Sequence, residues 1–174
     1  MNTQRFACSR DKFSKIITGY VILLGAVFLL IPLFTEGSSE YTEPLRIAGV
    51  LILLLILLFY FLAPISYTLN NEGLTIERKW KSKLIPADQI IQIRLPEEKE
   101  LSWPIRTFGN GGLFGYTGRY YSKHIGSMIW YCSRRDRQLI IERLANRPVI
   151  ISPDEPARLV WAWGELKRPS QVSE

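Results

Sequence analysis

The chain has 174 residues, which is enough for one folded domain beside any membrane segments, and a formal net charge of +6 at pH 7. The basic excess is modest and unevenly spread, so nucleic-acid binding is not expected. The two isolated cysteines, Cys8 and Cys132, define no metal site.

Two uninterrupted apolar runs stand out near the N-terminus, although the mean hydropathy of the whole chain is close to zero. They cover residues 16–34 and 47–65, and neither contains a charged side chain. A helix of that length rises roughly 28 Å, which is close to the hydrocarbon thickness of a bilayer. The runs therefore predict a transmembrane hairpin. A cleaved signal peptide is the less favoured alternative for the first run, because the run is long and no clear small-residue cleavage site follows it.

The charges around these runs predict how the hairpin is oriented. Residues 1–15 form a short basic tail with four basic residues and one acidic residue, whereas the connection at 35–46 has three acidic residues and one basic residue. Short segments rich in Lys and Arg stay in the cytoplasm, so both termini are expected there. Cytoplasmic thiols stay reduced. Cys8 lies near enough to the membrane for acylation, but a free thiol is the favoured interpretation.

After the second run the pattern changes from helical to alternating without a flexible linker, so the folded domain is expected close to the membrane. A β-hairpin is predicted around the turn at 71–73, because Asn and Gly supply the positive φ angles that such turns need. The predicted strands are residues 67–70, 74–78, 83–86, 90–95, 125–133, 138–143 and 147–152. Residues 96–118 are expected to be irregular, and Ile91, Ile93 and Leu95 are expected to share one strand face.

A C-terminal helix is predicted from the residues that follow Ser152. Ser152 is a favourable N-cap, Pro153 suits the first helical position, and Glu155 completes a capping box. The apolar residues at helical spacing are Pro156, Leu159, Val160, Trp163 and Leu166. Trp161 falls outside that face, which is expected to pack on the domain.

Three segments resemble the bacterial PH-domain (pleckstrin-homology-like) family. They are YTLNNEGLTI at 67–76, KSKLIPADQIIQI at 81–93 and RQLIIERLANRPVIISPDEPARLV at 137–160. The stretch RTFGNGGLFGYTGRYY at 106–121 is similar to a signature of one membrane-anchored subgroup. The segment MIWYCS at 128–133 departs from the family pattern, in which a small residue and Thr tend to follow the Tyr. The resemblance covers roughly residues 65–167.

The resemblance implies an α+β membrane protein. A two-helix transmembrane hairpin would precede a PH-like β-barrel or sandwich of about seven antiparallel strands, capped by a C-terminal α-helix. The implied domains are a basic cytoplasmic tail at 1–15, the hairpin at 16–65, a PH-like cytoplasmic domain at 66–167 and a tail at 168–174. The implied location is the bacterial cytoplasmic (inner) membrane, as a multi-pass protein. The resemblance implies no agreed activity.

A glycine-rich segment contains Gly109, Gly111, Gly112, Gly115 and Gly118. It lacks the Lys-Ser/Thr of a P-loop and no helix pattern follows it, so tight turning of the backbone is favoured over nucleotide binding. His124 is the single histidine and has no partner at ligand spacing, so it indicates neither a metal site nor a catalytic site. No cofactor is expected.

Aromatic and basic residues interleave around these glycines and form the predicted interaction surface. It consists of Trp103, Arg106, Phe108, Leu113, Phe114, Tyr116, Arg119, Tyr120 and Lys123. Tyr and Trp favour the headgroup zone and cations favour anionic lipid, so membrane contact, a protein interface and closure of the core all stay open. A secondary basic patch consists of Lys79, Lys81 and Lys83, which would share one face if extended; a solvated edge strand is favoured there. A turn with Arg134, Arg135 and Arg137 is expected to be solvated in the same way.

The favoured function is a non-catalytic interaction module, anchored at the cytoplasmic face of the membrane, that binds a protein partner or lipid headgroups. Self-association and binding of anionic lipid are both compatible with this hypothesis. The alternative is an assembly or accessory subunit of a larger membrane complex, with the hairpin as its main interface. A membrane-bound enzyme is the third interpretation, because no acid–base pair or nucleophile emerges from the sequence.

The predicted orientation can be tested by labelling single cysteines. In a chain without Cys8 and Cys132, an impermeant thiol reagent added to intact spheroplasts should modify the Ser38→Cys variant and spare the Ser170→Cys variant. The physical reason is that the acidic connection is expected outside and the basic segments inside. Labelling of the Ser170→Cys variant alone would mean that the hairpin is inverted.

Overall fold

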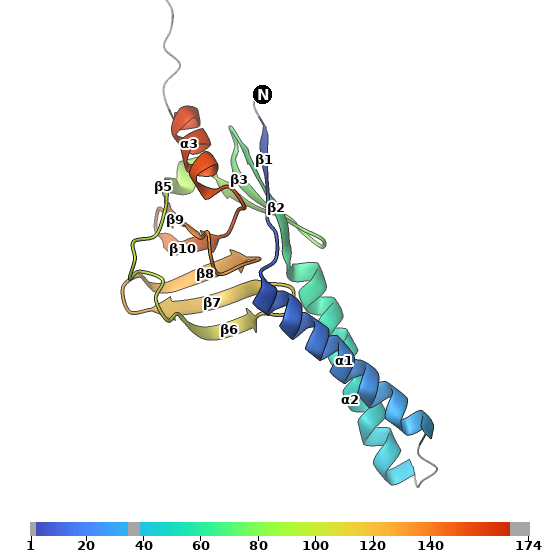
Figure 1. The fold of residues 1–174 in the computed structure, drawn as a ribbon. Helices are drawn as coiled ribbons and strands as arrows, with labels where there is room; N and C mark the ends of the chain where they lie inside the picture. The colour runs from blue at the N-terminus through green and yellow to red at the C-terminus, as the bar shows by residue number, and fades with distance from the viewer. Residues whose placement is uncertain (1–2, 35–38, 168–174) are drawn as a thin grey trace, which may run out of the picture.

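The computed structural model describes residues 3–34 and 39–167, so part of the acidic connection and the C-terminal tail lie outside the described residues. Two helices, α1 (Lys12–Phe34) and α2 (Ser39–Leu62), run side by side and project from a β-domain (Figure 1). α1 begins before the first predicted span. α2 ends before the second predicted span does, because Pro64 and Ile65 already belong to a strand.

The two helices pack on each other and expose apolar side chains on their other faces. A Cβ atom at Gly49 would lie 2.7 Å from Leu29, so this glycine lets the helices approach closely. The outward-facing side chains of Leu23 and Leu51 are 62% and 60% exposed. Both helices are long and apolar enough to cross a membrane, and their exposed apolar surface is compatible with membrane association.

The first sheet is antiparallel and has the strand order β1-β2-β3-β4. Its strands are β1 (Gln4–Ala7), β2 (Pro64–Asn70), β3 (Gly73–Arg78) and β4 (Lys83–Pro86). β1 lies in the segment expected to be a basic tail. Phe6 on β1 is 2% exposed and lies opposite Tyr67 on β2, whereas its neighbour Arg5 is less buried. Because β1 pairs with β2 and buries Phe6, the segment before α1 is part of the domain.

The second sheet has six strands in the order β5-β9-β10-β8-β7-β6. They are β5 (Ile90–Arg94), β6 (Ile105–Gly111), β7 (Tyr116–Ser122), β8 (Gly126–Cys132), β9 (Leu139–Arg143) and β10 (Asn146–Ile151), with the 3₁₀ helix η1 (Ala87–Gln89) before β5. β8 and β10 pair in parallel, and the other neighbours pair antiparallel.

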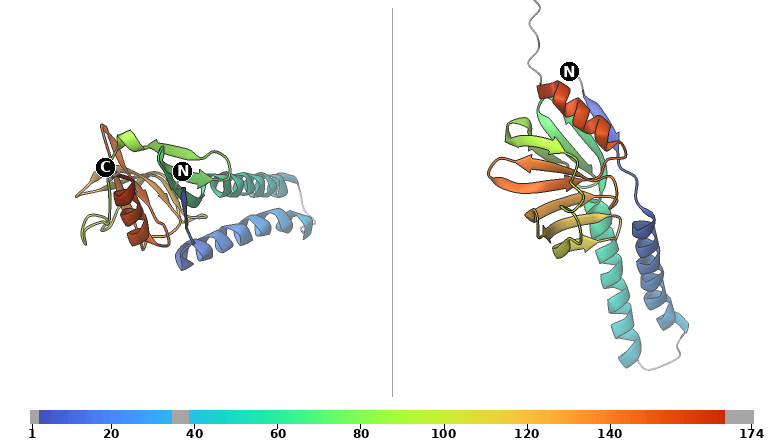
Figure 2. Two further views of the ribbon diagram at one scale, coloured as in Figure 1. Left: turned by 90° about the horizontal axis from the view of Figure 1, so that it is seen from above. Right: turned by 60° about the vertical axis from the view of Figure 1, so that its left-hand side comes forward.

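The two sheets form a sandwich that does not close into a barrel (Figures 1 and 2). The last helix, α3 (Pro156–Lys167), packs on β2 and β5. The predicted order of two apolar helices, a β-domain and a C-terminal helix is therefore confirmed. The described residues contain ten strands instead of about seven, and the parallel pair was not predicted.

The segment expected to be irregular, 96–118, contains β6 and the start of β7, so that prediction is wrong. Gly109 on β6 lies opposite Gly118 on β7, and both have a positive φ, of 112° and 128°. A Cβ atom at Gly118 would lie 2.2 Å from the carbonyl oxygen of Phe108. Gly109 and Gly118 therefore allow two strands to approach closely. Gly112 and Gly115 lie in the turn between β6 and β7 with positive φ angles, so tight turning of the backbone is correct for these two.

A register irregularity in β5 changes which side chains face the core. Ile90 and Ile93 are buried, whereas Ile91 and Leu95 are 55% and 52% exposed. The predicted shared face of Ile91, Ile93 and Leu95 is therefore wrong. A bulge between Ile90 and Gln92 breaks the alternation on which the prediction depended.

The C-terminal helix begins later than predicted. α3 starts at Pro156, and Ser152 does not cap it; the Ser152 hydroxyl instead accepts a hydrogen bond from the Ser133 amide at 2.9 Å. The predicted apolar face is correct at Leu159 and Trp163, which are buried beneath the helix. The buried face of the helix was therefore predicted correctly, but the residue at which the helix begins was not.

Removing the buried tryptophan of α3 should strongly destabilise the domain. Trp163 is 6% exposed, so Trp163→Ala should lower the free energy of unfolding by roughly 3–5 kcal/mol through the lost ring and the cavity left behind. Trp161 is 64% exposed, and the matched Trp161→Ala change should cost under about 0.5 kcal/mol. Thermal unfolding of the purified full chain measures both. Equal melting temperatures for the two variants would contradict the packing of this helix.

Candidate functional site

The structure divides the predicted interaction surface into three groups. Tyr120 is 1% exposed and stacks on Trp130 with ring centroids 4.3 Å apart, so it belongs to the core. Leu113 and Tyr116 are buried, so their prediction as surface residues is wrong. Together with the partly buried Phe114 they lie next to residues of the helices and of the segment that precedes α1. The exposed group consists of Trp103, Arg106, Phe108, Arg119 and Lys123.

Most of the exposed group gathers along β6 in what we call the edge surface. It consists of Trp103, Ile105, Arg106, Phe108, Arg119 and Tyr121. The side chains of Trp103, Ile105 and Phe108 are 95%, 67% and 73% exposed. β6 ends its sheet, and its outer edge has no partner strand among the described residues. Of the six strands in this sheet, β6 lies nearest the helices (Figures 1 and 2).

One member of the edge surface, Ile105, was missed by the sequence analysis. It lies opposite Tyr121, which belongs to the aromatic residues that interleave with the glycines in the sequence. Ile105 falls at the start of a strand that was not recognised, so no face was assigned to it. Alternation within a recognised β6–β7 hairpin would have identified it.

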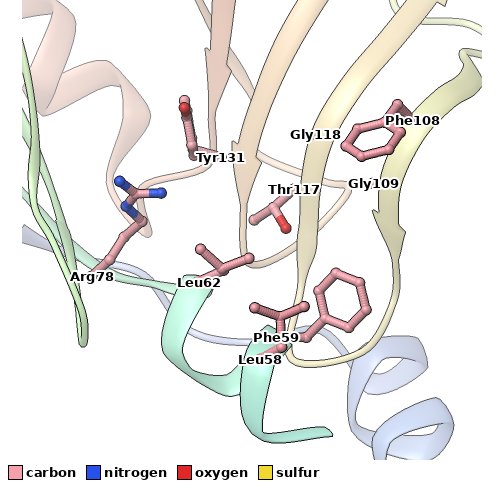
Figure 3. Close-up of a pocket in the computed structure, with 9 residues that line it drawn as sticks. All are labelled: Leu58, Phe59, Leu62, Arg78, Phe108, Gly109, Thr117, Gly118 and Tyr131. Atoms are coloured by element: carbon pink, nitrogen blue, oxygen red, sulfur yellow. The ribbon is translucent and has the colours of Figure 1, made fainter. Parts of the chain in front are cut away.

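A largely apolar pocket of about 380 Å³, which we call the α2 pocket, lies between the edge surface and the end of α2 (Figure 3). It is lined by Leu58, Phe59, Leu62, Arg78, Phe108, Gly109, Thr117, Gly118 and Tyr131. Arg78 lies on the side away from Phe108, with its guanidinium 5.4 Å from the centre of the Tyr131 ring. The α2 pocket suits an apolar side chain of a partner, with one cation at its rim.

The turn between β6 and β7 is fastened to α1. The Asn110 side chain accepts a hydrogen bond from the Leu113 amide at 3.0 Å and donates one to the Gly115 carbonyl at 2.9 Å. Phe114 adopts a left-handed conformation with φ of 60°, and its amide donates a hydrogen bond to the Thr18 hydroxyl of α1 at 3.0 Å. The contact with the helix and the Asn110 bridge together hold this turn in its uncommon geometry.

We define the neck as residues 8–14 together with the domain residues that they contact. Asp11 caps the start of α1, because its Oδ1 atom accepts the Ser14 amide at 2.7 Å. Its Oδ2 atom accepts the Tyr116 hydroxyl at 3.0 Å and the Arg135 amide at 3.1 Å. Burial, followed by the nearby Asp11 carboxylate, raises the pKa of Tyr116, so the phenol keeps its proton and continues to donate. One carboxylate therefore joins the helix to the second sheet.

A second carboxylate, that of Asp154, holds the neck from the other side. It accepts hydrogen bonds from the Ser9 amide at 3.0 Å and the Ser9 hydroxyl at 2.6 Å. Arg134 pairs with Asp154 at 3.2 Å and with Asp136 at 2.6 Å, and its side chain is only 16% exposed. The prediction that Arg134 is solvated is therefore wrong, because its guanidinium bridges two carboxylates.

A further pocket of about 370 Å³, the neck pocket, lies where the helices meet β2. It is lined by Cys8, Ser9, Arg10, Lys15, Tyr60, Ala63, Pro64, Ile65, Lys79 and Phe114. The Lys79 ammonium contacts both the hydroxyl and the ring face of Tyr60. Burial raises the pKa of Cys8 to about 11, which leaves a protonated and weakly nucleophilic thiol at neutral pH. This supports the free-thiol interpretation of Cys8.

The secondary basic patch does not form one strand face. Lys83 lies on β4, whereas Lys79 and Lys81 lie in the connection between β3 and β4. The predicted alternation is therefore wrong, because the chain turns between residues 78 and 83. His124 is exposed in the turn between β7 and β8, and the described residues contain no group of three His, Cys, Asp or Glu side chains that could hold a metal.

Comparison with known proteins agrees with this architecture. The family model of the bacterial PH domain matches residues 65–164, which run from β2 into α3. The chain belongs to the bacterial PH-domain family. No curated protein and no solved structure matches it. PH domains are generally non-catalytic interaction modules. In this chain β1 adds a strand to the PH domain from outside the matched residues.

Acid should loosen the attachment of β1 to the PH domain. Burial acts to raise the pKa of Asp154, but the hydrogen bonds from Ser9 and the Arg134 guanidinium lower it below its ordinary value of 3.8. Because the folded-state pKa is depressed, this stabilisation is fully present above pH 3.8 and is lost as the pH falls through the folded-state value. Amide hydrogen-exchange protection of residues 4–9 should therefore fall in strong acid.

Substitution should reproduce this loosening at neutral pH. Asp154→Ala removes the acceptor for Ser9 and Arg134 and should cost roughly 1–3 kcal/mol of local stability in residues 4–9. Glu155→Gln is the matched control, since Glu155 is exposed and pairs with Arg158. Unchanged exchange in the Asp154→Ala variant would mean that Asp154 does not hold the neck.

Proposed function

We propose that the chain is a membrane-anchored, non-catalytic interaction module whose edge surface docks a protein partner beside the bilayer. The hairpin of α1 and α2 spans the bacterial cytoplasmic membrane, and both termini lie in the cytoplasm. The observation that carries the proposal is the group of exposed apolar side chains on and just before β6, whose outer edge has no partner strand among the described residues.

The anchoring is supported by the faces of α1 and α2 that no described residue covers. An apolar surface of this extent is unstable in water and stable in hydrocarbon. β1 precedes the hairpin and β2 follows it, yet the two strands pair. This pairing supports a hairpin that crosses the membrane twice, with β1 and β2 on the same side.

The docking role is supported by the chemistry of the edge surface. Exposed aromatic residues and arginines are the residue types that dominate the binding energy of protein interfaces. An unpaired strand also presents a row of backbone N–H and C=O groups, to which an extended segment can add as a further strand. Lipid cannot supply such a matching row, so this edge favours a protein partner. The adjacent α2 pocket would receive an apolar side chain of that segment.

An accessory subunit that binds through its hairpin is less well supported. Gly25 and Gly49 both face the other helix of the hairpin. A Cβ atom would lie 3.0 Å from Ile52 at Gly25 and 2.7 Å from Leu29 at Gly49, so these two small residues are used within the hairpin. The outward faces carry large apolar side chains, such as Leu23 and Leu51, which suit lipid as well as protein. Specific helix–helix interfaces in membranes are instead enriched in small residues.

The proposal predicts that a single change on β6 releases the partner. Phe108→Ser should lower recovery of crosslinked partners from native membranes by about 30-fold or more, as expected when a central aromatic contact is lost. Trp161→Ser is the matched control, because Trp161 is an exposed aromatic residue on α3. Equal recovery with both variants would reject the edge surface. Crosslinks that map to the outward faces of α1 and α2 would favour the accessory-subunit hypothesis instead.

A further inference from the structure

The neck pocket gathers three cations, Arg10, Lys15 and Lys79. None of them forms an ion pair with the residues that the structure describes. Arg10 precedes α1, Lys15 lies in its first turn and Lys79 follows β3, so three separate segments bring positive charge to one pocket. Arg10 and Lys15 belong to the basic segment from which the orientation of the hairpin was predicted, whereas Lys79 is brought to the same pocket from the β3–β4 connection.

Among the described residues, no Asp or Glu lines the neck pocket. Asp11 precedes α1 beside Arg10 and accepts hydrogen bonds from three neutral donors, those of Ser14, Tyr116 and the Arg135 amide. Asp154 pairs with Arg134. The three cations therefore outnumber the one carboxylate beside them that has no cationic partner in the described part of the chain, and this net positive charge favours an anionic ligand.

The position of the neck pocket indicates what kind of anion it would meet. Lys15 lies at the start of the apolar stretch of α1, and Tyr60 lies in the last turn of α2. Tyr and Lys at the ends of transmembrane helices lie at the level of the lipid headgroups. The pocket also contains Ala63, Pro64 and Ile65, so its lining combines basic and apolar side chains. The headgroup region of a phospholipid likewise joins a charged phosphate to an apolar part.

We propose that the neck pocket binds the phosphate of an anionic phospholipid. Arg10, Lys15 and Lys79 contact the phosphate oxygens, because guanidinium and ammonium groups form strong charge-assisted hydrogen bonds to phosphate. The Tyr60 and Phe114 rings, which contact each other edge to face with centroids 5.3 Å apart, form one wall beside the glycerol portion. The proposal rests on the membrane anchoring proposed above, but it does not depend on the edge surface.

A lipid at this position would link parts of the chain that are distant in sequence. Arg10 belongs to the neck, and Lys79 belongs to the β3–β4 connection of the first sheet. Phe114 belongs to the β6–β7 turn, and its ring lies 5.6 Å from the Arg10 guanidinium. Binding would therefore stabilise the junction between the hairpin and the PH domain. An anionic bilayer should raise the melting temperature of the full chain more than a neutral bilayer does.

The test compares two triple variants that lose the same charge. The pocket variant is Arg10→Gln/Lys15→Gln/Lys79→Gln, and the control variant is Lys81→Gln/Lys83→Gln/Lys123→Gln, whose residues are exposed and lie outside the pocket. Full-length chains are reconstituted in nanodiscs of phosphatidylcholine with or without phosphatidylglycerol. Retained lipid is measured by native mass spectrometry after detergent extraction, and stability is measured by thermal unfolding.

Wild type and the control variant should retain one phosphatidylglycerol per chain and gain stability in the anionic nanodiscs. The pocket variant should lose roughly tenfold or more of the retained lipid, together with most of that gain, because the charge-assisted contacts are gone. Equal retention by the two variants would overturn the proposal. Titration with inorganic phosphate separates the sources: an equal gain in stability from millimolar phosphate alone would make the ligand a soluble phosphate and overturn the lipid assignment.

Alkaline carbonate extraction of the native membranes that contain the chain distinguishes this proposal from the proposed function. A chain that resists extraction but retains phosphatidylglycerol no better than the pocket variant would overturn the lipid site alone. A chain that carbonate removes would overturn the anchoring. Partner recovery with Phe108→Ser reports on the edge surface independently of either result.

Discussion

The pairing of β1 with β2 is the constraint on which the rest of this structure depends. The two strands flank the helical hairpin in sequence, and Ala63 alone separates α2 from β2. The hairpin must therefore leave the domain at the start of α1 and return to it at the end of α2, beside the same sheet. This closure brings the start of α1, the end of α2 and the β3–β4 connection into one place, so the neck pocket is a consequence of strand pairing. Burial of Phe6 in the core stabilises the pairing.

Elements with a strong local pattern were predictable from the sequence, and elements defined by distant partners were not. The apolar runs and the spacing of Leu159 and Trp163 are local signals. β1 has four residues and one fully buried side chain, and its partner lies some sixty residues further along the chain, so no window around residue 6 reveals it. The glycines of β6 and β7 were read as turns because glycine density usually indicates turns. In the structure Gly109 lies opposite Gly118, and the two glycines let the strands approach closely.

The candidate site shows the same limit at the level of single residues. Tyr120 and Tyr121 are adjacent and chemically identical, yet Tyr120 is in the core and Tyr121 is 47% exposed. Their division follows from the alternation of β7, which had not been recognised. Arg134 was expected in solvent because a run of arginines usually is. One of its two carboxylate partners, Asp136, lies two residues away. The other, Asp154, lies twenty residues away, at the start of the segment that leads into α3.

The neck and α1 hold the PH domain to the helical hairpin through hydrogen bonds at three points. Asp11, Thr18 and Ser9 each bond to a different part of the domain, and Thr18 does so through the turn that ends β6. That turn carries Phe114, which also lines the neck pocket. The edge surface and the proposed lipid site are therefore two sides of one rigid junction. A partner that adds to β6 would meet a strand whose height above the bilayer is set by α1, and an anionic lipid beside Phe114 would reinforce that placement from beneath. Fixing the strand before the partner arrives lowers the entropy cost of docking.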